Sequence, residues 1–355
     1  MFRRPHALTE SGPNSPGQRL ALFLVAAIMV VAACAGGSGA SPSPSTIASV
    51  APAASVEATP LPTAAPSAAA FPVTLTDDEG TTVEIEAEPE VIVSLTPATT
   101  ETLFALGVGD RVVGKGQDFF LYPPEAVDIP DVATFDAVDI EQVVSLEPDL
   151  VFAGGNFFTP PDAITRMREL GLPVVVLYAA SVEAVFADIE LIGQASGRSA
   201  EATAIVERMR TEFDAVEAAV AGLATPRLFY ELDATGAIYG PADDSFLAEM
   251  IELAGGDPIT TGSADKFDIS VERLIEEDPE LILLADAPFG VTPEQVAARP
   301  GWNVMTAVQE GEIRPIDDQT VTRPGPRLFL GLRLLAETIH PGVALPAAAP
   351  IPPVR

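Results

Sequence analysis

The chain has 355 residues, which is long enough for about two domains with separate hydrophobic cores. Its 51 Asp and Glu residues far outnumber its 19 Lys and Arg residues, and this excess argues against nucleic acid as a partner, because phosphate binding depends on clustered cations. One cysteine excludes a disulfide within the chain, and two histidines leave little material for a histidine-based zinc or catalytic site.

Residues 1–34 are predicted to be a secretion signal. Three arginines precede the apolar run Leu20–Val31, which is shorter than the roughly 20 apolar residues that a membrane-spanning helix needs. Residues 35–70 are rich in proline, serine and alanine and hold few large apolar side chains, so we expect a disordered tether.

The folded part is expected to begin near Phe71. Alternating apolar and polar residues on both sides of Asp78-Glu79-Gly80 are typical of a β-hairpin. Apolar runs of strand length then alternate with helical stretches, which predicts a parallel sheet. The expected strands are 91–95, 112–114 and 173–177, and the expected helices are 100–106, 160–170 and 181–194.

The strongest helical pattern in the chain covers Ser199–Leu223. Its apolar residues recur at steps of three and four, and charged residues fill the other face. As one helix it would be about 35 Å long, which is enough to bridge two domains.

An internal repeat flanks this helix. Ile140–Phe152 and Val271–Leu283 align on Glu141 and Glu272, and each predicts a short helix, an acidic-Pro stop and a buried strand. The later half also predicts strands at 227–231 and 313–316, helices at 245–254, 302–308 and 327–339, and a frayed tail at 341–355.

The predicted fold is therefore an α/β protein with two similar lobes and parallel sheets, joined by one long helix. Its expected parts are an N-terminal lobe at 71–180, a helical connector at 181–224 that contains the bridging helix 199–223, and a C-terminal lobe at 225–340.

The end of the predicted signal, Val31-Ala32-Ala33-Cys34, resembles the lipobox of bacterial lipoproteins. In that family the cysteine is lipidated and becomes the first mature residue. The alternative is an incidental cysteine at the end of an ordinary signal peptide.

The order and spacing of several patches resemble the substrate-binding proteins of ABC importers for cobalamin and ferric siderophores. The patches are 91–116, 122–126, 140–152, 247–256, 269–284, 299–302 and 323–328, and together they span about residues 71 to 340. The resemblance implies two Rossmann-like lobes, a ligand cleft between them and a rigid bridging helix, as in the helical-backbone periplasmic-binding-protein fold. This arrangement agrees with the general rule that open parallel sheets bind ligands beyond the carboxyl ends of their strands.

The same resemblance implies that Glu141 and Glu272 dock onto arginines of a membrane permease. The internal repeat independently puts these two glutamates in equivalent places on the two lobes. The alternative, compatible role is stabilisation of a helix N-terminus by a carboxylate.

Aromatic residues in loops are the candidates for the wall of the ligand cleft, since flat rings would contact a corrin or a siderophore shell. They are Phe119, Phe120, Phe135, Phe157, Phe158 and Phe267, and ordinary core packing is the alternative for each. Arg323 is expected to meet an anionic oxygen of the ligand or to pair with a local acid, and Tyr239 is a weaker candidate.

The resemblance implies a monomeric, extracytoplasmic, lipid-anchored binding component of an ABC importer, which captures a corrinoid such as cobalamin, or a ferric siderophore, and delivers it to a permease with its ATPase. Haem or another small molecule in the same cleft is the alternative, and a surface adhesin is a weaker one. No cofactor or bare metal site is expected, because the mature domain would hold only His340. Catalysis is not expected either, because GxSxG, HExxH and P-loop patterns are absent from the sequence.

Overall fold

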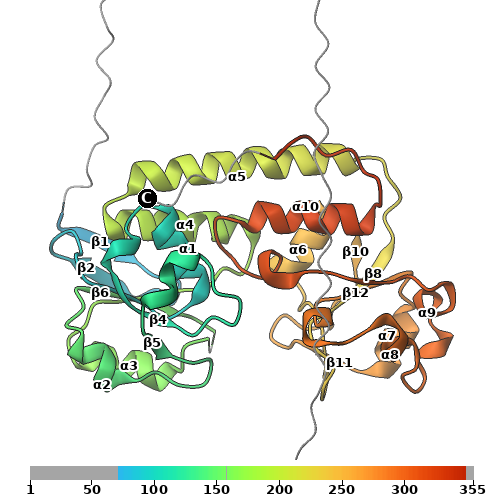
Figure 1. Ribbon diagram of the computed structural model, residues 1–355, viewed down its shortest axis with the longest axis horizontal. Coiled ribbons are helices and arrows are strands. Elements are labelled where there is room, and N and C mark those ends of the chain that lie inside the picture. The colour runs from blue at the N-terminus through green and yellow to red at the C-terminus, as the bar shows by residue number, and fades with distance from the viewer. Residues whose placement is uncertain (1–70, 157, 349–355) are drawn as a thin grey trace, which may run out of the picture. The chain divides into compact units, whose positions relative to one another are not determined.

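The computed structural model describes residues 71–156 and 158–348, and it has an α/β fold with two parallel sheets (Figure 1). The predicted hairpin is confirmed as β1 (Val73–Thr76) paired antiparallel with β2 (Thr82–Ile85). Its turn is held by Asp77, whose carboxylate accepts hydrogen bonds from the backbone N–H groups of Glu79 and Thr81 at 3.1 and 2.7 Å.

The first lobe is built on a five-stranded parallel sheet of order β5-β4-β3-β6-β7. Every residue of β6 and β7 is buried, which explains why their sequences are continuous apolar runs. The strands are β3 (Ile92–Ser94), β4 (Val112–Gly116), β5 (Asp131–Ala133), β6 (Leu150–Gly154) and β7 (Val174–Leu177). The helices are α1 (Pro97–Ala105), α2 (Ile140–Ser145), α3 (Pro161–Glu169) and α4 (Val182–Ser196), with short 3₁₀ turns η1 (Gly109–Arg111) and η2 (Pro124–Asp128).

The second lobe contains a four-stranded parallel sheet of order β10-β8-β12-β13 and a small antiparallel pair, β9 and β11. The strands are β8 (Arg227–Glu231), β9 (Ile238–Tyr239), β10 (Asp257–Pro258), β11 (Asp268–Ile269), β12 (Leu281–Leu284) and β13 (Ile313–Pro315). The helices are α6 (Phe246–Leu253), α7 (Val271–Glu277), α8 (Pro293–Ala297), α9 (Thr306–Glu310) and α10 (Leu328–Ile339), with 3₁₀ turns η3 (Ala287–Phe289), η4 (Trp302–Val304) and η5 (Asp318–Thr320).

Two predicted helices differ from the structure. The single helix expected at 302–308 is wrong, because the backbone is extended at Met305, whose fully buried side chain joins the core of the second lobe and separates η4 from α9. The first helix of the first lobe starts at Pro97 rather than at Thr100, because Thr96 caps it through the backbone N–H of Thr99.

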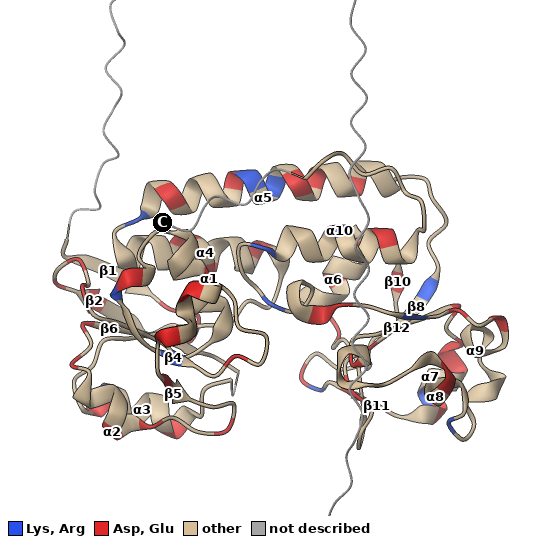
Figure 2. Ribbon diagram, in the orientation of Figure 1, with Lys and Arg blue, Asp and Glu red and all other residues tan. Residues whose placement is uncertain are grey.

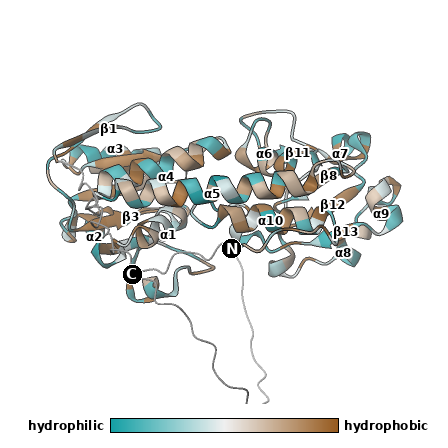
Figure 3. Ribbon diagram, turned by 90° about the horizontal axis from the view of Figure 1, so that it is seen from above, coloured by the Kyte–Doolittle hydropathy of each residue, from teal (hydrophilic) through white to brown (hydrophobic). Residues whose placement is uncertain are grey.

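The long predicted helix is confirmed as α5 (Ser199–Val220), which packs against α4 and α10 (Figure 3). It ends before the predicted Leu223, since Gly222 adopts a φ of +82° and turns the chain away. None of the helices in the described ranges is long and apolar enough to cross a membrane.

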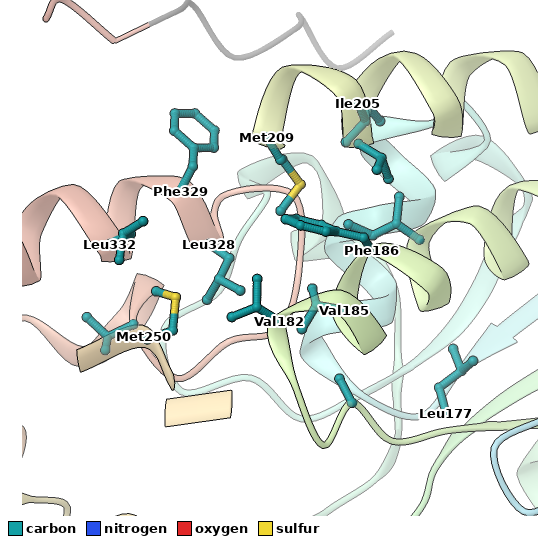
Figure 4. Close-up of a cluster of buried hydrophobic side chains, with 14 of the residues drawn as sticks. Leu177, Val182, Val185, Phe186, Ile205, Met209, Met250, Leu328, Phe329 and Leu332 are labelled. Atoms are coloured by element: carbon teal, nitrogen blue, oxygen red, sulfur yellow. The ribbon is translucent and has the colours of Figure 1, made fainter. Parts of the chain in front are cut away.

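A single hydrophobic cluster passes through both lobes along α5. It joins side chains of α4 and α5, such as Phe186 and Met209, to side chains of α6 and α10, such as Met250 and Leu328 (Figure 4). Two further clusters each stay within one lobe, beside its own sheet. The connection between the lobes is therefore packed like a core, which resists bending at this side.

The internal repeat is also confirmed in the structure. In each copy a short helix leads into a buried central strand, α2 into β6 and α7 into β12. The acidic residue before each proline, Glu147 or Asp278, has a positive φ of 49° or 45°, so both copies stop the helix with the same left-handed turn.

The segment after α10 forms no helix or strand as far as residue 348. It is not frayed throughout, because Val343 and Leu345 pack against the large cluster and the Arg333 guanidinium donates to the carbonyl of Pro346.

Candidate ligand-binding cleft

A cavity of about 280 Å³ lies between the lobes and is lined by residues of both. In the first sheet it sits where the strand order reverses, between β3 and β6, and in the second sheet it lies beyond the carboxyl ends of the neighbouring strands β12 and β13. The loops that follow β3, β6, β12 and β13 supply lining residues, including Thr96, Gly154, Ala285 and Asp317. This is the place at which open parallel sheets bind ligands.

Aromatic rings form much of the wall on the first lobe. Phe120, Phe158 and Tyr178 line the cavity. Phe158 lies 6.4 Å from Tyr178 and 6.1 Å from Phe135, measured between ring centroids, and Phe135 and Phe158 are 69% and 53% exposed. These rings make a partly open apolar ledge at the mouth of the cavity.

The second lobe contributes two rings, Phe246 and Phe289, and several polar groups to the lining. Phe289, on η3, is 70% exposed, and its ring centroid lies 5.6 Å from that of Phe120 in an edge-to-face contact between the lobes. Behind the ring, the Asp318 carboxylate accepts hydrogen bonds from the hydroxyl groups of Tyr230 at 2.5 Å and Thr322 at 2.6 Å.

Two carboxyl groups of the lining have raised pKa values. Burial raises the pKa of Asp318 to about 6, against the opposing effect of its hydrogen bonds from Thr322 and Tyr230. Burial, and next the charge of Asp78, raise the pKa of Asp188 on α4 to about 8. Asp188 is therefore mostly uncharged at neutral pH, while Asp318 is mostly ionised.

Arg323 is the only cation among the described residues that line the cavity, and its charge is already paired. Its two terminal nitrogens donate to the Asp118 carboxylate at 3.0 and 2.8 Å, and it lies 3.8 Å from Glu101. Arg327 likewise donates to Glu101 and lies 3.4 Å over the ring of Tyr122. A ligand anion would have to displace Asp118 to reach Arg323.

The other predicted wall residues lie in different places. Phe119 is 77% exposed beside Phe120 and is not part of the lining. Tyr239 belongs to β9 of the antiparallel pair and Phe267 directly precedes β11, where the N–H of Gly240 bonds to the carbonyl of Phe267, and both lie outside the lining. Phe157 and Cys34 fall outside the described residues.

The two glutamates predicted to dock onto a permease occupy matching positions. Glu141 and Glu272 are each the second residue of a short helix, α2 or α7, behind an N-cap side chain from Asp139 or Ser270. Both are exposed, neither forms an ion pair within the described ranges, and acidic residues are visible on both helices (Figure 2). Each therefore offers a free carboxylate and also suits the helix N-terminus.

Five residues of the site were not predicted from the sequence: Glu101, Asp118, Phe289, Asp317 and Asp318. The rule that ligands lie beyond the carboxyl ends of strands would have found the last two, because they directly follow the predicted strand 313–316. Glu101 carries no local signal, since its partner Arg327 is 226 positions away in the sequence.

Comparison with known proteins agrees with this arrangement. A family model described as periplasmic binding protein matches residues 92–320. The chain is 32% identical over 276 residues to YvrC of Bacillus subtilis, named as an uncharacterized ABC transporter substrate-binding lipoprotein, with 76% of this chain and 86% of that protein covered. It is 31% identical over 286 residues to a cobalamin-binding protein of Halobacterium salinarum, with 77% and 75% covered.

A solved structure shares the fold. The periplasmic heme-binding protein RhuT from Roseiflexus sp. RS-1 superposes with a TM-score of 0.61 at 25% identity, covering 70% of this chain and 98% of that one. Proteins of this kind bind and deliver ligands outside the cytoplasm and perform no catalysis. With its two lobes, bridging helix and interlobe cavity, the chain belongs to the periplasmic binding protein family, as an ABC transporter substrate-binding protein.

Proposed function

We propose that this protein captures a bulky, uncharged metal chelate of the corrinoid type in its interlobe cavity and delivers it to an ABC permease. The observation that carries the proposal is the cavity itself, which lies beyond the carboxyl ends of strands of both sheets and is lined by aromatic rings from both lobes. The cobalamin-binding relative supports the same ligand class.

The charges of the cavity favour an uncharged ligand. Ferric catecholates and the propionates of haem carry negative charge, which binding sites normally match with free Arg or Lys side chains. In the described lining the single guanidinium, that of Arg323, is held by Asp118, while Asp317 and Asp318 add carboxylates. Carboxylates instead accept hydrogen bonds from amide N–H groups, which corrinoids carry around their rim.

The size of the cavity suits partial enclosure of such a ligand. At about 280 Å³ it is smaller than the roughly 300–1,000 Å³ of pockets for drug-sized molecules, so a corrinoid would fill it only in part. The exposed rings of Phe135, Phe158 and Phe289 offer apolar area for the rest of the ligand at the mouth.

Haem is a second candidate, supported by one residue of the lining. Tyr178 faces the cavity, and a tyrosine phenolate is a known axial ligand of haem iron. The heme-binding neighbour has the same fold. The paired state of Arg323 argues against haem, because its propionates would find no free cation.

The remaining parts of the chain would serve delivery. Lipidation of Cys34 would anchor the protein to a membrane, with residues 35–70 as the tether. Glu141 and Glu272 would then dock onto cationic residues of the two permease halves.

The test is thermal unfolding of the full chain carrying Cys34→Ser, against cyanocobalamin, cobinamide, a ferric hydroxamate, a ferric catecholate and haem. We expect a corrinoid to stabilise the fold, by about 2.7 kcal/mol at 100 times its dissociation constant. Phe158→Ala should weaken this binding, and Phe267→Ala, which lies outside the lining, is the matched control. If only haem or only the ferric catecholate stabilised the fold, the inference that the cavity favours an uncharged ligand would be wrong.

A further inference from the structure

Four charged side chains join the two lobes beside the cavity, and we call them the interlobe clasp: Glu101, Asp118, Arg323 and Arg327. Both carboxylates belong to the first lobe and both guanidinium groups to the second. Arg327 donates to Glu101 from Nε at 3.0 Å and from Nη2 at 2.8 Å, and its backbone N–H also reaches Glu101 at 3.2 Å. Arg323 donates hydrogen bonds to the Asp118 carboxylate from both terminal nitrogens.

The clasp is nearly closed to solvent. The side chains of Glu101 and Asp118 are 2% and 5% exposed, and those of Arg323 and Arg327 are 12% and 13% exposed. Two positive and two negative groups balance, and each carboxylate is met by a planar fork of donors. Removing one member would leave a buried charge without its partner, which costs far more free energy than breaking a surface ion pair.

The clasp is built into the wall of the cavity. The Asp118 carboxylate also accepts hydrogen bonds from the backbone N–H groups of Phe120 at 3.0 Å and Tyr122 at 3.3 Å, so it shapes the loop that carries the Phe120 ring. On the other side, Arg323 and Pro324 line the cavity directly. The Asp118 carboxylate thus holds both the loop that carries the Phe120 ring in the first lobe and the segment around Arg323 in the second lobe.

The backbone between the two arginines also lies close to the first lobe. A Cβ atom placed on Gly325, between the two arginines, would lie 3.6 Å from the carbonyl oxygen of Ala98 and from a carboxylate oxygen of Glu101. The ring of Tyr122 covers the Arg327 guanidinium from the first lobe. The segment 323–327 is therefore seated on the start of α1.

We infer that the clasp consists of positioning residues that hold the lobes at the separation needed for the cavity and that set the rate of ligand exchange. Arg323 then acts through Asp118 and Phe120, and its guanidinium does not bind the ligand. This inference rests on the proposed role of the cavity in ligand capture. The continuous core along α5 holds the lobes at one side, and the clasp holds them at a second point.

The first test needs no ligand. Spin labels on Thr165→Cys of α3 and Glu310→Cys of α9, both exposed, report the distance between the lobes in the full chain carrying Cys34→Ser. We expect Asp118→Asn and Glu101→Gln to broaden the distance distribution or shift it to longer distances. Glu183→Gln is the matched control, because the Glu183–Arg210 pair is exposed and joins α4 to α5. An unchanged distribution in Asp118→Asn and Glu101→Gln would overturn the clasp.

The second test measures exchange of cyanocobalamin by stopped flow. Asp118→Asn should raise the dissociation rate by about tenfold or more, and Arg323→Gln should raise it similarly. The double variant should be no faster than either single one, because the two residues act together. Additive effects would contradict a shared contact, and retarded dissociation would overturn the inference.

Circular dichroism checks that each variant folds. Arg323→Lys keeps the positive charge but loses the planar guanidinium fork, so its distance distribution should lie between those of wild type and Asp118→Asn. If wild-type protein does not bind cyanocobalamin, the proposed ligand fails, whereas the spin-label distances still decide whether the clasp holds the lobes.

Discussion

Asp286 is a residue at which burial affects the pH dependence of stability. It follows β12 and is 3% exposed beside Glu231, which is itself fully buried and held by Arg299. Burial, and next the charge of Glu231, raise the pKa of Asp286 to about 7. Both terminal nitrogens of Arg299 are bonded to Glu231, and Asp286 keeps its proton in the folded protein up to about neutral pH.

This arrangement predicts a loss of stability with rising pH. Between about pH 4 and pH 7 the folded state holds a proton on Asp286 that the unfolded state has lost, so the free energy of unfolding falls across this range. Asp286→Asn removes this group's titration, and the variant should gain in melting temperature over wild type as the pH rises from 5 to 8. Melting curves at several pH values test this, with the exposed Asp162→Asn as control; a constant difference at all pH values would contradict it.

At the scale of elements, the position of η5 depends on close packing against α10. Gly331 of α10 faces η5 so closely that an added Cβ would lie 2.2 Å from the carbonyl oxygen of Thr320. No side chain fits in this space without moving backbone. Since η5 carries Asp318 into the lining of the cavity, Gly331 also fixes the position of this part of the cavity wall.

We therefore expect Gly331→Ala to destabilise the protein by about 1–3 kcal/mol, the usual cost of overpacking, and to weaken ligand binding by displacing η5. Urea unfolding and a binding assay with the ligand found in the melting screen measure the two effects. Gly236→Ala is the matched control, because nothing lies within 4 Å of an added Cβ there. Equal stability of the two variants would contradict this prediction, because it would show that α10 accommodates the added methyl group without a loss of stability.

At the scale of the whole molecule, the proposed docking surface would need both lobes. The repeat gives each lobe a short helix with an exposed glutamate at its second position, Glu141 on α2 and Glu272 on α7. Because one core runs through both lobes, movement of one lobe is resisted by the other, and the two carboxylates keep a limited range of separations.

Reversal of both charges is the test of docking. We expect Glu141→Lys combined with Glu272→Lys to abolish uptake by cells that depend on this protein, while ligand affinity stays at the wild-type value. Glu207→Lys combined with Glu310→Lys changes the net charge equally at exposed sites on α5 and α9 and should leave uptake intact. Normal uptake by the Glu141/Glu272 double variant would rule out the docking role.

The sequence by itself determined most of the longer secondary elements, the repeat, the bridging helix and the two-lobed α/β fold. These follow from periodicities within short windows, such as the apolar positions Ala202, Ile205 and Met209 that are buried along α5. The same local signals predicted loop phenylalanines as wall residues, and two of them, Phe120 and Phe158, line the cavity.

Only the tertiary structure decided which loops face one another across the lobes. It joined Glu101 to Arg327 and Asp118 to Arg323, brought Phe289 to Phe120, and left Phe267 on the antiparallel pair outside the cavity. Ion pairs and ring contacts of this kind depend on the relative placement of two sheets, and partners more than 200 positions apart leave no pattern in a local window. The charge that a ligand meets is therefore a property of the folded cleft.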